Sequence, residues 1–96
     1  MKRGWVYIMT NKPFGTLYVG VTSDLAARVW NHRSGTGSEF CKRHDLTRLV
    51  YAEELATIYE AIAREKAIEA WKRNWKLRQI IELNPDWDDL FERINK

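Results

Sequence analysis

Several residue types are scarce in this 96-residue chain, and each scarcity excludes a class of protein. The one cysteine, Cys41, allows no internal disulfide and is typical of a protein from a reducing compartment. Only two histidines accompany it, His32 and His44, and they lie twelve residues apart, so the sequence indicates no zinc site. No apolar run approaches the ~18 residues of a membrane-spanning helix, and residues 5–9 are too short for a signal-peptide core. We therefore expect a soluble, cytoplasmic protein with no membrane partner.

The composition predicts a folded chain with a modest core. Apolar residues make up 45% of the sequence, which excludes a disordered protein. This length suits one domain and is too short for two, so we treat residues 1–96 as a single domain. Aromatic residues make up 12% and include five tryptophans, which fill volume well in a small core. Four of them fall in helical patterns that predict packing: Trp30, Trp71, Trp75 and Trp87.

Charge is mild overall but unevenly placed. The net charge is +3. Residues 60–79 hold six Lys or Arg against three Glu, whereas residues 82–96 hold five acids against two bases. A basic helix next to an acidic tail suits a protein that meets phosphates with one face. A solvated helix with i,i+4 ion pairs explains the same pattern equally well, and the charge alone does not separate the two.

Hydrophobic patterning predicts a hairpin followed by a helix. Strands are expected over residues 5–10 and 16–21, separated by a proline- and glycine-containing turn. Both strands are nearly continuous in apolar residues, so we expect helices to cover both faces of the sheet. Thr22, Ser23 and Asp24 offer N-cap oxygens to a helix over residues 24–34. The polar stretch 35–45 is predicted as a loop, either a solvated connector or a place where basic residues meet nucleic acid.

The second half predicts one more strand and further helices. We expect a strand over residues 47–53 and a helix from residue 56 or 57 to about 73, continuing to 83 with a bend at Asn74. A last helix is expected after Asn84. The side of this helix that packs against the core would be formed by Trp87, Leu90, Phe91 and Ile94. The order β-β-α-β-α-α predicts an α+β domain, a small three-stranded antiparallel sheet flanked by helices. Its core would span about residues 4–81, with a C-terminal helical extension over 82–96.

Glu65 is the most informative charged residue. On a helical wheel it falls within an apolar arc formed by Ile58, Ala61, Ile62 and Ile68. A carboxylate is costly to bury without a partner. Either the Glu65 carboxylate pairs with an arginine or lysine inside the fold, or it faces a cleft and binds a divalent cation. The residues alone also allow Tyr7 and Tyr18 to be ordinary strand aromatics.

Five elements taken in order resemble the GIY-YIG nucleases. They are Val6-Tyr7-Ile8-Met9, Leu17-Tyr18-Val19-Gly20, Arg28, His32 and Ala63-Arg64-Glu65. Arg28 follows Tyr18 by ten residues, and His32 follows one helical turn later; without the resemblance, these two are simply a pair on one helix face. The resemblance covers about residues 4–81 and is closest to the small stand-alone members of the family.

The resemblance implies an endonuclease that hydrolyses DNA phosphodiester bonds with Mg²⁺ or Mn²⁺. Tyr18 would be the general base for water, Arg28 would stabilise the phosphate, and Glu65 would hold the metal. Tyr7 would position water or phosphate, and His32 would tune Tyr18 or share the proton transfer. A phenol with a pKa near 10 is a poor base at neutral pH, so Tyr18 needs Arg28 or the metal to lower it. A single carboxylate completed by phosphate oxygens and water suits Mg²⁺.

The sequence departs from the family pattern at several positions. Trp5 precedes Val6 where the family has glycine, and Val19 replaces an isoleucine. Val21 stands where many members have lysine, which removes one phosphate contact. Asn74 is a candidate for the asparagine that often follows the metal glutamate.

DNA is the expected partner, with low sequence specificity or a separate targeting protein. Damaged, branched or single-stranded sites are expected substrates, as in DNA repair. A non-catalytic nucleic-acid-binding module that retains the nuclease fold is the alternative, and a protein-interaction adaptor explains none of the tyrosine–arginine–glutamate set. The expected nucleic-acid contacts are Gly20, Lys42, Arg43, Lys72, Arg73 and Lys76.

Overall fold

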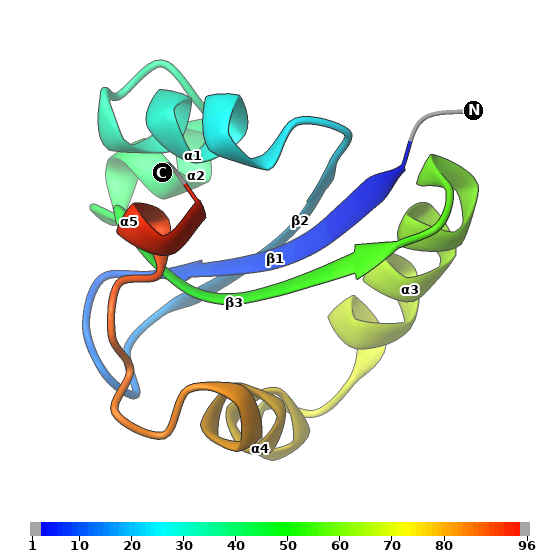
Figure 1. Ribbon diagram of the computed structural model, residues 1–96. Helices are drawn as coiled ribbons and strands as arrows, with labels where there is room; N and C mark the ends of the chain where they lie inside the picture. The colour runs from blue at the N-terminus through cyan, green and yellow to red at the C-terminus, as the bar shows by residue number, and fades with distance from the viewer. Residues whose placement is uncertain (1–2, 95–96) are drawn as a thin grey trace.

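A computed structural model describes residues 3–94 and shows a three-stranded antiparallel sheet between two groups of helices (Figure 1). The strands are β1 (Gly4–Thr10), β2 (Leu17–Thr22) and β3 (Arg48–Leu55), in the order β2-β1-β3. Both pairings of the central strand β1 are antiparallel. The predicted α+β fold is confirmed, and each strand boundary lies within two residues of its prediction.

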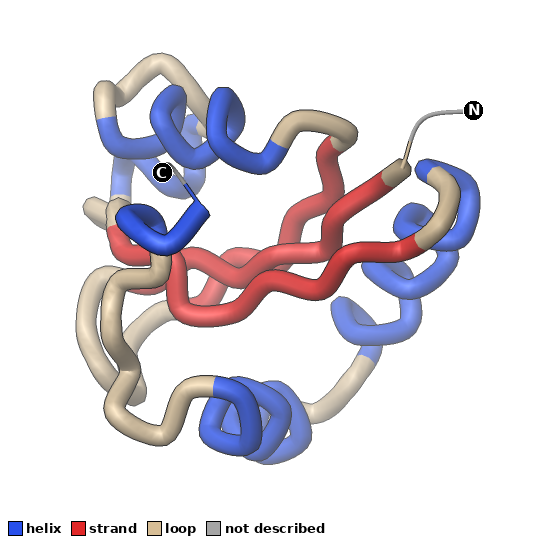
Figure 2. The backbone as a smooth tube through the Cα atoms, in the orientation of Figure 1, coloured by secondary structure: helices blue, strands red, loops and turns tan. Residues whose placement is uncertain are grey.

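The helices divide between the two faces of the sheet (Figure 2). On one face lie α1 (Leu25–Arg33), α2 (Glu39–Arg43) and the one-turn α5 (Phe91–Ile94); on the other lie α3 (Ile58–Ala70) and α4 (Arg73–Leu83). Alternate β1 side chains serve two separate cores, because successive strand residues point to opposite faces. Val6 and Ile8 belong to the α3–α4 core, whereas Tyr7 and Met9 belong to the α1–α2 core. The predicted cover on both faces is confirmed.

The hairpin turn is held by side chains and by a distant helix. Thr10 donates through its hydroxyl to the carbonyl oxygens of Lys12 and Thr16. Arg73, near the start of α4, donates through Nη2 to the carbonyl oxygens of Phe14 and Gly15, at 2.7 Å each. Because β2 follows directly from this turn, these bonds help to place the strand that carries Tyr18.

Two predictions about the middle of the chain are wrong. Residues 35–45 are not simply a loop, since α2 forms there: Ser38 caps it by accepting from the Phe40 amide, and Cys41 is buried beneath it. The long helix does not bend at Asn74. It ends at Ala70, because Trp71 and Lys72 take extended backbone conformations, and α4 starts afresh. The predicted start of α3 is confirmed, with Thr57 as its N-cap.

The predicted helix after Asn84 is wrong for residues 84–90, and residues 95–96 of the predicted extension lie outside the described residues. Residues 84–90 run without helix along β3, and only the single turn α5 follows. Asn84 explains the difference, because its side-chain amide donates to the carbonyl oxygens of Val50 and Asp88 instead of capping a new helix. The backbone of Leu90 then donates to the Leu49 carbonyl, and Trp87 adopts a φ of 57°. The segment acts as a strap across β3.

The tryptophans pack less than predicted. Trp87 is buried in the strap, and Trp71 is half-buried beneath the Arg64 guanidinium. Trp30 and Trp75 instead remain 60% and 58% exposed, so the packing prediction is wrong for these two. Within residues 3–94, no helix is long and apolar enough to cross a bilayer.

Candidate active site

The two tyrosines lie on the same face of the sheet. Tyr7 sits opposite Gly20, and Met9 sits opposite Tyr18, so the two phenols are diagonal neighbours with ring centroids 6.3 Å apart. Gly20 makes this possible: a Cβ at that position would overlap the Tyr7 ring. The structure therefore gives Gly20 a packing role against Tyr7, and the nucleic-acid contact expected at Gly20 stays a prediction.

His32 completes a buried polar cluster. It projects from α1, is 3% exposed, and shares a 2.9 Å hydrogen bond between its Nε2 and the Tyr7 hydroxyl. Its ring also meets the Tyr18 ring edge-on, with centroids 5.4 Å apart. Burial, helped by the positive charge of Arg28, lowers the pKa of His32 below its usual value of 6.5, so the ring is neutral at neutral pH. Gly37 closes over the ring, since a Cβ there would lie 2.6 Å from Nδ1.

Tyr7 and His32 lie behind the surface of the site. Tyr7 is 0% exposed, so solvent does not reach it. Burial raises the pKa of Tyr7 strongly, and neighbouring Tyr18 adds to this while Arg28 opposes it. The resemblance implies that Tyr7 positions water or phosphate; in the structure its hydroxyl is bonded to His32 and does not reach solvent. The exposed side chain of Arg28 approaches the cluster from α1, and its charge acts on Tyr7, Tyr18 and His32 together.

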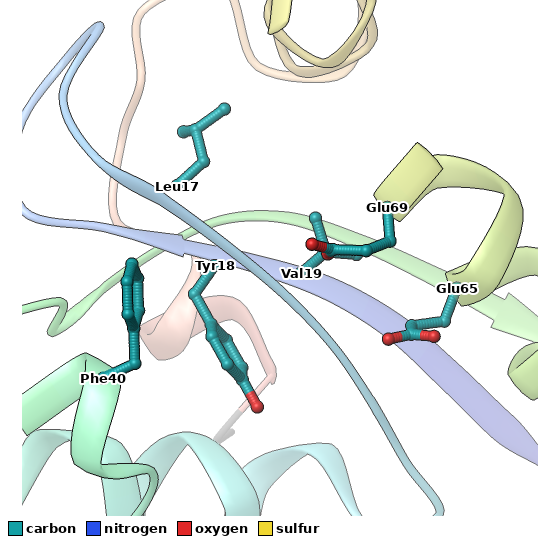
Figure 3. Close-up of a pocket in the computed structure, with 6 residues that line it drawn as sticks. All are labelled: Leu17, Tyr18, Val19, Phe40, Glu65 and Glu69. Atoms are coloured by element: carbon teal, nitrogen blue, oxygen red, sulfur yellow. The ribbon is translucent and has the colours of Figure 1, made fainter. Parts of the chain in front are cut away.

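Tyr18 and Glu65 meet at one pocket, although they come from opposite layers of the fold. The pocket lies along β2, has a volume of about 360 Å³, and is lined by Leu17, Tyr18, Val19, Phe40, Glu65 and Glu69. Figure 3 shows the two glutamates reaching in from α3, with the Tyr18 ring between them and Phe40. Burial raises the pKa of Tyr18, as does the Cys41 thiol, while Arg28 lowers it.

Glu65 has the surroundings of a cation ligand. It is half-buried, and no arginine or lysine within residues 3–94 forms an ion pair with it, so the internal ion pair left open by the sequence is not found there. Burial raises its pKa, and the nearby Glu69 carboxylate raises it further against the opposing charge of Lys66. Two adjacent carboxylates without a cationic partner fit a hard divalent cation such as Mg²⁺. The described residues hold no cluster of three or more acidic, histidine or cysteine ligands, so phosphate and water would complete the shell.

Comparison with known proteins identifies the family. A family model described as the GIY-YIG catalytic domain matches residues 3–79. The chain belongs to the GIY-YIG family. Members of this nuclease superfamily act on nucleic acid, which sets the substrate class at the superfamily level.

The relatives of this GIY-YIG chain are small proteins of similar length. A UPF0213 protein from Staphylococcus epidermidis is 38% identical over 82 residues, which cover 85% of this chain and 99% of the relative. A UPF0213 protein from Staphylococcus aureus is 39% identical with the same coverage. The solution NMR structure of the UPF0213 protein BH0048 from Bacillus halodurans matches with a TM-score of 0.50 and 28% identity, over 84% of each chain.

The basic residues expected to contact nucleic acid lie in two places in this GIY-YIG fold, on α2 and at the start of α4. Lys42 and Arg43 are exposed on α2, the helix that carries the pocket residue Phe40. Lys72 and Lys76 lie in the other layer, just before and within α4. Arg73 is already engaged with the hairpin turn, so its guanidinium serves the fold.

Sequence reasoning missed two residues at the site. Phe40 forms a wall of the pocket, and Gly37 makes room for His32. Phe40 was hidden because a single aromatic residue in a polar stretch has no periodicity. The one available signal was Ser38, whose side chain caps the helix two residues before Phe40.

Proposed function

We propose that this protein is a divalent-cation-dependent endonuclease that hydrolyses DNA phosphodiester bonds. One observation carries the proposal: Tyr18 and Glu65 line the same solvent-reached pocket, while His32 and Tyr7 support Tyr18 from behind and Arg28 faces the cluster. An ordinary binding surface has no need of an unpaired, half-buried carboxylate facing a phenol.

Tyr18 is the group placed to take a proton from the attacking water. Burial raises its pKa, which disfavours the phenolate, so a positive charge must offset this when the base is needed. Arg28 supplies part of that charge, and its guanidinium suits a phosphate oxygen. A cation bound at Glu65 would supply further positive charge, favouring the phenolate and stabilising the charge that develops on the phosphate.

Tyr7 and His32 act as positioning residues. Their hydrogen bond fixes both rings, and the neutral His32 ring holds the edge of Tyr18. Because burial raises the pKa of Tyr7 and lowers that of His32, both groups stay neutral, and their part is to hold the Tyr18 ring in place. Neither group reaches solvent in the free protein, so neither contacts water or phosphate directly.

The test is a cleavage assay on supercoiled, branched and single-stranded DNA, with Mg²⁺, with Mn²⁺ and with a chelator. The proposal predicts cation-dependent cleavage that Tyr18→Phe abolishes, because that change removes only the hydroxyl. Tyr59→Phe is the matched control, since Tyr59 is 69% exposed on α3 and should tolerate the same change. DNA binding without cleavage in either cation would instead favour the alternative, a nucleic-acid-binding module that retains the fold.

A further inference from the structure

The pocket has an aromatic wall that the proposed hydrolysis does not use. Phe40 is 42% exposed and projects from α2 to form this wall. Its ring lies nearly parallel to that of Tyr18, with centroids 6.2 Å apart and an interplanar angle of 30°. His44 also contacts the Phe40 ring, in a tilted arrangement with centroids 4.6 Å apart. A large apolar ring is therefore held in a fixed direction while much of its surface meets water.

The position of this ring relative to the acidic wall is informative. Glu65 and Glu69 stand on one side of Tyr18, and Phe40 stands on the other (Figure 3). A phosphate that reaches both Tyr18 and Glu65 lies on the acidic side of the Tyr18 ring, and Phe40 lies on the far side of that ring, with 6.2 Å between the two ring centroids. The nucleotide attached to that phosphate would bring its base to the aromatic wall.

The charge on α2 suits a nucleic-acid strand passing over it. Lys42 and Arg43 follow Phe40 on the same short helix and are exposed. Basic side chains that track the backbone, next to an aromatic ring that stacks a base, form the usual arrangement for binding single-stranded nucleic acid. Within a duplex, the faces of a base are covered by its neighbours, so only an unpaired base offers a free face.

We propose that Phe40 stacks on an unpaired base next to the scissile phosphate, and that this protein acts on DNA with unpaired nucleotides. The inference rests on the proposed function, which brings the phosphate to Tyr18 and Glu65. It narrows the expected substrates to those with unpaired nucleotides, which are single strands, flaps or bulges, in preference to a continuous duplex, and it assigns their recognition to Phe40. Phe40 is then a specificity residue that contacts the substrate.

The experiment measures binding without cleavage. Oligonucleotides that carry 2-aminopurine at an unpaired position are titrated with the protein in the presence of a chelator, beside a fully paired duplex of the same sequence. Stacking on an aromatic ring quenches 2-aminopurine. The variants are Phe40→Ala, Phe40→Leu and Phe40→Trp, with Tyr59→Ala as the control for loss of an exposed ring on α3.

We expect Phe40→Ala to weaken single-strand binding by about 5- to 150-fold, the range for loss of one stacked base, and to abolish quenching. Phe40→Leu should behave like Phe40→Ala although it keeps apolar bulk, which separates stacking from a structural role. Phe40→Trp should restore both binding and quenching. Duplex affinity and the Tyr59→Ala control should be unchanged.

Each remaining outcome contradicts a different claim. If the unaltered protein binds the single strand and Phe40→Ala binds and quenches equally well, the inference about Phe40 is wrong and the proposed hydrolysis stands. If the unaltered protein binds no DNA of any form, the proposed function fails first. Equal loss of single-strand and duplex binding in Phe40→Ala would also overturn the inference, because it would mean that the change damaged α2 rather than a base contact.

Discussion

The two faces of the central strand bury different kinds of side chain. Towards α3 and α4, Val6 and Ile8 pack against aliphatic residues such as Ile68 and Ile80. Towards α1 and α2, the same strand buries the phenol of Tyr7, which is bonded to an imidazole. Since burial of polar groups costs free energy unless they are hydrogen-bonded, the Tyr7–His32 bond offsets a cost that Val6 and Ile8 on the first face do not incur.

The polar face, towards α1 and α2, shows where burying polar groups costs free energy. The Nδ1 atom of His32 has no hydrogen-bond partner among the described residues, although it is buried. Burial also raises the pKa of Cys41 to about 11, so its thiol is uncharged at neutral pH and packs as a small apolar side chain in this core. Two glycines, Gly20 and Gly37, leave the space that the Tyr7 and His32 rings occupy. The comparison teaches that the buried part of the site, Tyr7 and His32, lies in one core, while Glu65 reaches the pocket from the helix that covers the other core.

The largest effect on stability should come from the aliphatic face. Ile68→Ala removes a fully buried side chain, and we expect a loss of about 2–5 kcal/mol in the free energy of unfolding. Because Ile68 shares α3 with Glu65, cleavage is compared per folded molecule, and we expect it to fall less than in Glu65→Gln. Urea denaturation measures the loss, with Ile62→Ala as the control, since Ile62 is 37% exposed on the same helix. A smaller loss for Ile68→Ala than for Ile62→Ala would show that burial against the aliphatic face does not determine stability.

On the polar face, Gly20→Ala should affect stability and site together. Its new methyl group would overlap the Tyr7 ring, and overpacking of this kind costs about 1–3 kcal/mol. The displaced Tyr7 would also lose its bond to His32, so activity should fall further than the fraction unfolded explains. A melting curve and a cleavage rate on the same sample give the answer. Unchanged cleavage by the folded protein would show that the position of Tyr7 does not matter to Tyr18.

The pH dependence of stability should follow His32. The pKa of His32 is lower in the folded protein than the value of 6.5 expected in the unfolded chain. Below pH 6.5, His32 is therefore protonated more readily in the unfolded chain than in the folded protein. Stability should therefore fall as the pH drops below about 6.5. His32→Gln should be less stable than the unaltered protein near pH 8 but should lose this part of the pH dependence. His44→Gln is the control, since His44 is exposed. An identical pH profile in His32→Gln would contradict the assignment.

The smallest effects should separate two basic residues that look alike in sequence. Lys42→Ala should leave the melting temperature unchanged and reduce the salt dependence of duplex binding by about 0.9 log unit per log unit of salt, if Lys42 neutralises one phosphate. Arg73→Ala should instead lower stability by about 1 kcal/mol, because it removes hydrogen bonds to the hairpin turn. Binding measured across a salt series and a urea titration compare the two variants. A reduced salt dependence in Arg73→Ala, with unchanged stability, would reverse these roles.

The strands and the order of the site residues could be predicted because their signals are local. Continuous apolar runs broken by Pro13 and Gly15 define the hairpin, and the spacing of Tyr18, Arg28 and Glu65 identifies the family. The roles of these residues stay predictions. That Tyr7 is sealed from solvent could not be predicted, since its burial depends on α1 closing over the sheet.

The remaining errors come from contacts between distant segments. Asn84 resembles a helix cap in sequence, but its amide bonds to Val50 on β3 determine the strap. The five-residue α2 shows no helical period, and the break at Trp71 contains neither glycine nor proline. In each case tertiary packing overrides the local preference.

The central claim is that Glu65 holds a catalytic cation, and Glu65→Gln tests it most directly. The change keeps the shape of the side chain but removes its charge, so cation-dependent cleavage should be lost while DNA binding persists. Because the folded pKa of Glu65 is raised, its charged form opposes folding at neutral pH, and the variant should melt at the same temperature or slightly higher. Glu60→Gln, an exposed change on the same helix, should cleave normally. A Glu65→Gln protein that melts normally and still cleaves DNA in Mg²⁺ would contradict the account.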